Sequence, residues 1–147
     1  MLRPSLGRKQ KSHSQACHLL VFSVGGRRLA ATIEEIARIS EWKGSIPVPS
    51  RTPFVSAVVR NNDEILPVFN LAELLGVCVQ GENPFCITAK HPNGPMAICV
   101  DGDMPILHTI DRVRIQPYRD GEFEAVGSFA NGADEIPIIS FAHLGSA

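Results

Sequence analysis

The sequence has no apolar run approaching the roughly 20 residues that a membrane-spanning helix needs. Its first residues also lack the apolar core of a signal peptide, so we expect a cytoplasmic protein. A formal net charge of -1 gives no general attraction to nucleic acid or to acidic membranes. Neither nucleic-acid binding nor direct insertion into a membrane is therefore expected.

Paired metal-ligand motifs are also missing. The four cysteines, at positions 17, 78, 86 and 99, form no C-x2-C pair, and the five histidines form no H-x3-H pair. Cys86 and Cys99 lie in apolar strand-like runs, where a thiol packs as a small hydrophobic group. We predict buried free thiols, with no metal, disulfide framework or cofactor.

Acidic residues are absent before Glu34, whereas arginine and lysine are frequent there. Residues 1–16 are basic, polar and without apolar periodicity, which predicts a flexible arm that adds little to stability. Residues 17–147 are predicted to form the folded domain. The 147-residue chain is 44% apolar and 20% charged, which suits one compact domain or two small halves sharing a core.

Long helical patterns are scarce, and short apolar runs separated by turn residues dominate. The run at residues 18–24 ends at Gly25-Gly26, and Asn93-Gly94 divides the runs at 85–90 and 96–100. One short helix is predicted over residues 71–75, capped by Asn70 and closed by Gly76. Ten or so short strands indicate an all-β sandwich or barrel.

An internal repeat indicates two halves of similar design. A shift of 70 residues places Pro67 on Pro137, and a shift of 67 places residues 29–33 on residues 96–100. The shift of 70 aligns eight further positions with similar partners: Ala57, Asn61, Val68, Phe69, Asn70, Leu71, Ala72 and Leu74. Each half is predicted to be a barrel of about five strands, too small to fold alone. Two packed barrels create a groove where partners tend to bind.

From about Leu20 to Leu144 the sequence resembles the CheW-like coupling proteins of bacterial chemosensory arrays. The run LVFSVGGRRLAATIEEIARI resembles the opening strands of the family, which end in a V-x-E-I pattern. The run TPFVSAVVRNNDEILPVFNL resembles its P-x-x-x-x-G-x-x-N-L-R-G-x-I-x-P-V-x-D-L segment. The runs MAICVDGDMPI and VGSFANGADEIPIIS resemble its second half.

The resemblance implies two packed five-stranded antiparallel barrels, similar to Src-homology-3 domains, with a short connecting helix. It also implies a non-catalytic adaptor that joins the regulatory domain of a chemotaxis histidine kinase to the cytoplasmic tips of chemoreceptors. In the family the receptor lies in the groove, and the kinase contacts the exposed end of the first barrel. Edge strands and turn tips suit such contacts because they offer main-chain hydrogen bonds and apolar area.

Several polar positions depart from the family pattern. Ala57 stands where the family has glycine, Asn62 where it has arginine and Asp63 where it has glycine, and we assign Arg38 to the place of the V-x-E-I glutamate. We hypothesise that these positions face a partner whose charges differ correspondingly. The predicted partner-binding residues are Ile36, Arg38, Ala57, Val58, Arg60, Asn61, Asn62 and Asp63.

Other chemistries have simpler explanations. Asp101 and Asp103 flank Gly102 and could suggest a cation site, but such a triplet is common in turns. His108, Asp111 and a serine at position 128 or 140 supply the residue types of a hydrolase without a G-x-S-x-G motif.

Three alternatives remain open from the sequence. Trp42 is interpreted as a plug of one barrel end, with an exposed anchor as the alternative. A related adaptor could join a kinase or response regulator without any receptor. A small β-barrel enzyme or ligand-binding protein could instead use the groove, and convergent carboxylates or histidines lining it would favour that function.

Overall fold

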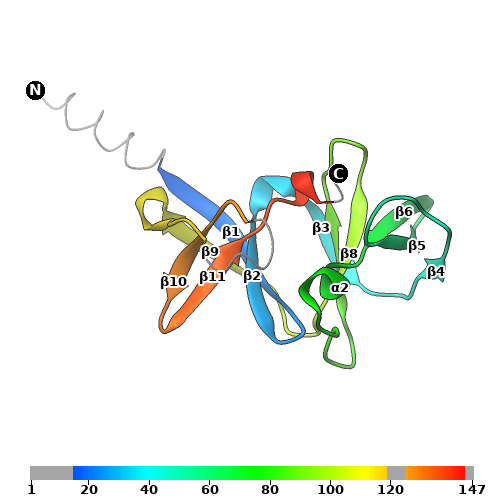
Figure 1. The fold of residues 1–147 in the computed structure, drawn as a ribbon, viewed down its shortest axis with the longest axis horizontal. Helices are drawn as coiled ribbons and strands as arrows, with labels where there is room; N and C mark the ends of the chain where they lie inside the picture. Colours follow the sequence, from blue (N-terminus) through cyan, green and yellow to red (C-terminus); the bar gives the residue numbers. More distant parts are fainter. Residues whose placement is uncertain (1–14, 119–124, 145–147) are drawn as a thin grey trace, which may run out of the picture.

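The computed structural model describes residues 15–118 and 125–144, and these form two curved β-sheets side by side (Figure 1). The first sheet has the order β10-β11-β2-β1-β9 and the second has the order β3-β7-β8-β6-β5-β4. The first sheet contains β1 (Ala16–Val24), β2 (Arg27–Thr32), β9 (Ile106–Asp111), β10 (Gly127–Asn131) and β11 (Asp134–Ile138). The second contains β3 (Ile36–Glu41), β4 (Ile46–Pro47), β5 (Val55–Asn61), β6 (Glu64–Phe69), β7 (Phe85–Ala89) and β8 (Met96–Val100).

The all-β prediction is confirmed, with one difference in strand number. The second sheet has six strands rather than five, because the two-residue strand β4 pairs with β5 at its edge. No helix in the described part of the chain is long and apolar enough to cross a membrane. Residues 1–14 lie outside the described residues, so the basic arm stays a prediction. Strand β1 already begins at Ala16, the last residue assigned to that arm.

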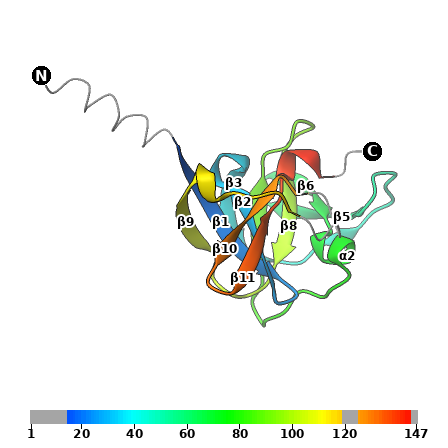
Figure 2. The same cartoon turned by 60° about the vertical axis from the view of Figure 1, so that its left-hand side comes forward.

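The two sheets are not successive along the chain. Strands β3 to β8 form the whole second sheet, whereas the first sheet combines β1 and β2 with β9, β10 and β11. The later strands return because β11 pairs in parallel with β2 and β9 pairs in antiparallel with β1. Figure 2 shows the first sheet turned toward the viewer, with α2, β5 and β6 on the right of the view.

The predicted repeat corresponds to a repeated strand arrangement. In the second sheet Val68 of β6 pairs in parallel with Ala97 of β8. In the first sheet Ile138 of β11 pairs in parallel with Ala30 of β2. The shift of 70 relates Val68 to Ile138, and the shift of 67 relates Ala30 to Ala97. The two sequence shifts therefore describe the same parallel pairing made once in each sheet.

The single α-helix, α2 (Leu71–Leu75), has the predicted boundaries. The Asn70 side chain accepts a hydrogen bond from the Glu73 backbone N–H at 3.0 Å, and Gly76 ends the helix with φ +70°. Its expected role as the link between the barrels is wrong, because it joins β6 to β7 within the second sheet. The 3₁₀ helices are η1 (Ile33–Glu35), η2 (Arg112–Arg114) and η3 (Phe141–His143).

The largest apolar core lies between the sheets and is shared by them. Phe22 and Phe141 from the first half meet Phe69 and Ile87 from the second, with 5.9 Å between the ring centroids of Phe22 and Phe141. Smaller clusters fill the inside of each sheet. Because each half contributes large side chains to one core, the halves are expected to fold as a single unit.

Two carboxylates fasten the connections around this core. Asp101 is 2% exposed and accepts hydrogen bonds from the backbone N–H groups of Gly25, Gly26 and Gln80, each at 2.8 Å. It thereby joins the β1–β2 turn to the segment after α2. Glu35 plays a similar part for the C-terminal 3₁₀ helix, accepting from the backbone N–H of Phe141 at 2.9 Å. Charged acceptors make stronger hydrogen bonds than neutral ones.

Candidate functional site

The polar segment from Arg60 to Glu64 is the tip of the β5–β6 hairpin. Asn61 pairs with Glu64, which leaves Asn62 and Asp63 as the two turn residues. Asn62 has φ +58°, in the left-handed region that asparagine tolerates better than most residues. The equivalent residue of the other half is Gly132, with φ +66°. The predicted turn is confirmed, and the repeat extends to its backbone conformation.

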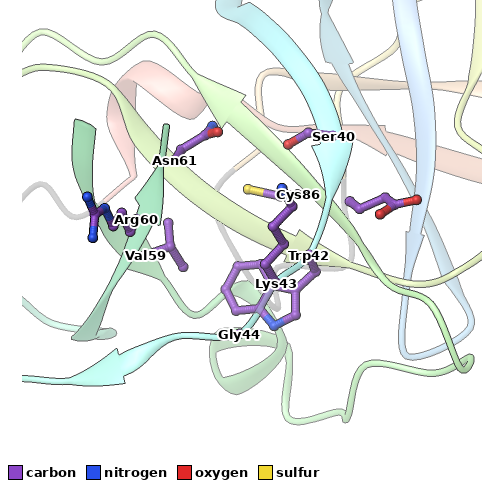
Figure 3. Close-up of a pocket in the computed structure, with 9 residues that line it drawn as sticks. Ser40, Trp42, Lys43, Gly44, Val59, Arg60, Asn61 and Cys86 are labelled. Atoms are coloured by element: carbon purple, nitrogen blue, oxygen red, sulfur yellow. The ribbon is translucent and has the colours of Figure 1, made fainter. Parts of the chain in front are cut away.

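A pocket opens beside this hairpin, between β5 and the end of β3 (Figure 3). Trp42 and Cys86 lie at its base and Arg60 and Asn61 at its hairpin side. The other lining residues are Ser40, Glu41, Lys43, Gly44 and Val59. The Nδ2 atom of Asn61 is buried without a hydrogen-bond partner among the described residues. An unpaired buried donor is costly and can be satisfied by an incoming acceptor.

Trp42 packs against the inside of the second sheet, which favours the plug interpretation over an exposed anchor. It is half-buried and packs against the inner cluster of Val59, Leu66, Val68 and Cys86. Its backbone N–H donates to the carbonyl oxygen of Pro84 at 3.0 Å. The indole ring is therefore held mainly by the protein's own core.

Arg38 lies on β3 and forms an ion pair with the hairpin. Its Nη2 is 3.6 Å from Oε1 of Glu64, and both side chains are about half exposed. The assignment of Arg38 to the place of the family's V-x-E-I glutamate stays a prediction. The nearby Glu35 has a different role, because its carboxylate binds the backbone of η3.

The remaining predicted site residues have mixed environments. Ile36 packs against the core between the sheets, and Ala57 packs against the inner cluster of the second sheet. Val58 is half-buried, whereas Arg60, Asn62 and Asp63 are exposed. Residues 57–63 are thus brought together on one hairpin. Ile36 lies away from it and is held by the shared core.

An apolar surface covers the outer side of this hairpin. Val59 and Leu66 are buried and paired, so the alternating partners Val58 with Pro67 and Arg60 with Ile65 point to the opposite side. Ile46 of β4 pairs with Val58 and extends the same side. We call Ile46, Val58, Arg60, Ile65 and Pro67 the outer face of β4–β6.

Three residues of this outer face, Ile46, Ile65 and Pro67, were missed from the sequence. Ile46 is 63% exposed and Ile65 is 70% exposed, on the two strands that flank β5. The exposure of Ile65 could have been predicted from strand alternation, because Leu66 and Val68 of the same strand point to the inner side. Ile46 gave no such signal because its strand has only two residues.

The shared core lies between the halves, where the groove was predicted. Among the apolar residues of β3 and β5, Val59 is buried and Ile36 packs against this core. Ile39 is 39% exposed and Val58 is half-buried.

The residues considered for catalysis have separate partners. The Asp111 carboxylate caps η2 by accepting from Val113 N–H at 3.1 Å, and Ser128 donates to Glu135 at 2.8 Å. Ser140 donates to Glu35 at 3.0 Å. Three backbone N–H groups occupy the Asp101 carboxylate, as described above. Among the described residues no group of three potential metal ligands is found.

The cysteine prediction is correct for two positions and wrong for one. Cys17 and Cys86 are buried, Cys99 is half-buried and Cys78 is exposed, because Cys78 lies in the loop after α2. Burial is the main cause that raises the pKa of Cys17 and Cys86. Burial, followed by the neighbouring Cys86 and Asp101, raises the pKa of Cys99 to about 12.

Comparison with known proteins agrees with this architecture. The sequence profile of the CheW-like domain matches residues 18–139. A chemotaxis protein CheW from Thermotoga maritima is 34% identical over 59 residues, which is 40% of this chain and 39% of that protein. The match thus spans about two-fifths of the relative's length.

A solved structure has a similar fold. The crystal structure of the scaffolding protein TtCheW from Thermoanaerobacter tengcongensis superposes with a TM-score of 0.76. The superposition covers 86% of each chain at 16% sequence identity. Because the profile of the CheW-like domain matches residues 18–139, which is most of its length, this chain belongs to the CheW-like domain family.

Proposed function

We propose that this protein is a non-catalytic adaptor in bacterial chemosensory signalling, which couples chemoreceptors to a histidine kinase or a related signalling partner. Membership of the CheW-like family supports the general role, and the relatives described above are named as a chemotaxis protein and a scaffolding protein. An adaptor needs exposed surfaces for two partners rather than a reactive site. It acts by binding the receptor and the kinase at the same time.

The observation that carries the proposal is the outer face of β4–β6. Ile46 and Ile65 expose large apolar side chains beside Arg60, a residue type frequent at binding hot spots. Strand β4 is also the edge of the second sheet, so its unpaired main-chain groups can add hydrogen bonds to a partner. We assign this face to the kinase regulatory domain.

The hairpin tip contributes selectivity within this proposal. Asn62 and Asp63 carry no positive charge where the family pattern has arginine followed by glycine. Single exposed charges contribute on the order of 1 kcal/mol or less, but unfavourable charges in an interface cost more and exclude partners. The tip therefore matches a kinase or receptor of its own pathway better than one from a standard chemotaxis system.

The test is a titration of the kinase regulatory domain from the protein's own pathway, followed by isothermal calorimetry. Ile65→Asp places a charge within the proposed face and is expected to weaken binding at least about tenfold, on the order of 1.4 kcal/mol. Val113→Asp is the matched control, since Val113 is 75% exposed on η2 of the other half. Equal binding by Ile65→Asp and the unmodified protein would refute the assignment of this face.

A further inference from the structure

Two cysteines lie directly opposite each other inside the second sheet. Cys86 of β7 is the register partner of Cys99 of β8 in an antiparallel pair. Directly opposed residues of such a pair project to the same side, with Cα atoms about 4.5–5.5 Å apart. Disulfides occur at Cα separations of about 4.4–6.8 Å. The strand register therefore places the two Cα atoms at a separation that a disulfide can span.

The two thiols share one environment on the inner side of the sheet. Cys86 is 4% exposed and packs with Val59, Leu66 and Val68. The negative charge of a Cys86 thiolate would raise the pKa of Cys99.

Small molecules have a route to each sulfur. Cys86 lines the pocket beside the hairpin, where Figure 3 shows its sulfur directed into the space between β3 and β5. Cys99 lines a second pocket, bounded by Ser56 and Val79 on the other side of Trp42. Trp42 lines both pockets and is the only tryptophan of the chain.

We propose that Cys86 and Cys99 form a reversible intrachain disulfide, so that the protein carries a redox-sensitive pair beneath its hairpin. Hydrogen peroxide is the two-electron oxidant. One thiolate attacks a peroxide oxygen and becomes a sulfenic acid, and the displaced hydroxide leaves as water after taking up a proton. The second thiolate attacks the sulfenic sulfur, forms the S–S bond and releases a second water.

Burial raises the pKa of both thiols. Each sulfur lines a pocket, so either thiol can react with peroxide first and the other then resolves the sulfenic acid. The reaction is slow at neutral pH and faster in mild alkali, because thiolates are the reacting species.

The test uses the full chain with Cys78→Ser, which removes the exposed thiol that could link to other molecules. The protein is treated with hydrogen peroxide, alkylated under denaturing conditions, digested and analysed by mass spectrometry. We expect a linked peptide pair containing Cys86 and Cys99, a monomer lighter by two hydrogen atoms, and recovery of both thiols with dithiothreitol. The Cys99→Ala variant, also with Cys78→Ser, should show no linked pair.

Trp42 fluorescence provides a second readout in the folded protein. Disulfides quench nearby indoles, so oxidation should lower the emission of Trp42 in the protein that retains both cysteines and leave the Cys99→Ala variant unchanged. Reduction should restore the emission. The unmodified protein shows how much peroxide is needed to oxidise the exposed thiol of Cys78. The proposal is overturned if, at that dose, Cys86 and Cys99 of the Cys78→Ser protein both remain fully alkylatable. It is equally overturned if Cys86 is found linked to Cys17 or to a second chain.

Discussion

Arg38 and Glu64 are joined by an ion pair, with 3.6 Å between Nη2 and Oε1, although their strands β3 and β6 are three positions apart in the second sheet. In a flat sheet these strands would be about 14 Å apart, given the usual spacing between neighbours. The contact therefore depends on the strong curvature of the sheet. It connects an edge strand to the first residue after the turn of the proposed binding hairpin.

Arg38→Glu should lower the free energy of unfolding by about 1 kcal/mol or less, because the ion pair is exposed and screened by solvent. Urea unfolding measures the effect. The doubly reversed protein, Arg38→Glu with Glu64→Arg, should recover most of the loss, and Arg51→Glu serves as an exposed control. A loss that the double reversal leaves unchanged would show that the two side chains do not interact.

Restoring the family's residues at the hairpin tip tests whether Asn62 and Asp63 exclude the partners of a standard chemotaxis system. We expect Asn62→Arg with Asp63→Gly to strengthen binding to a kinase regulatory domain and a receptor tip from a standard chemotaxis system. Arg38 is kept in this variant, because a glutamate there would face Glu64. If the unmodified protein already binds both partners as tightly as the variant, the tip is only a turn.

Asn62 also gives a stability control for that experiment. Its φ of +58° lies in the left-handed region, where a β-branched residue is strained. Asn62→Val should therefore destabilise the protein by about 1–2 kcal/mol, whereas Asn62→Gly should change its stability little. Thermal or urea unfolding of the two variants separates backbone strain from effects on binding. Equal stability of both would contradict the left-handed turn.

Glu35 is expected to be far more important for stability than its neighbour Glu34. Its carboxylate accepts hydrogen bonds from Ser140 Oγ and from the backbone N–H groups of Phe141 and Ala142. Removing an acceptor that serves several part-buried donors costs on the order of 2–3 kcal/mol. Glu35→Ala should show that loss in urea unfolding, and the exposed Glu34→Ala should show almost none. Similar values for the two variants would contradict the role given to Glu35.

Alkaline pH should destabilise the protein through Cys99. Burial raises the pKa of this thiol to about 12 in the folded protein, from an ordinary value of 9.0. Above pH 9 the unfolded chain loses this proton first, so the free energy of unfolding falls as pH rises from 9 toward 12. Under reducing conditions, Cys99→Ala should show a shallower fall over this range, and an identical slope would contradict the raised pKa.

Much of the fold could be predicted from local features of the sequence. Asn70 and Gly76 marked the ends of α2 because capping and left-handed termination depend on few neighbouring atoms. The repeat predicted equivalent strands, and the parallel pairs of Val68 with Ala97 and of Ile138 with Ala30 agree with it. Strand periodicity does not specify the partner strand, so the return of β9, β10 and β11 to the first sheet could not be inferred.

The candidate site was predicted less completely. Residues 57–63 formed one hairpin as expected, since the turn signal is local. The apolar outer face depends on which side of each strand the core covers, and that is decided by packing between distant segments. The exposure of Ile46 and of Cys78 follows from such packing. The opposition of Cys86 and Cys99 likewise depends on the register of β7 and β8, which composition does not reveal.

The most direct test of the adaptor role is whether the protein bridges its two partners. A receptor cytoplasmic fragment on vesicles and a kinase regulatory domain, both from the protein's own pathway, are sedimented together with and without it. The account predicts that the kinase domain pellets only when this protein is present, and that Ile65→Asp abolishes pelleting whereas Val113→Asp does not. Kinase pelleting that is the same with and without the protein would contradict the account.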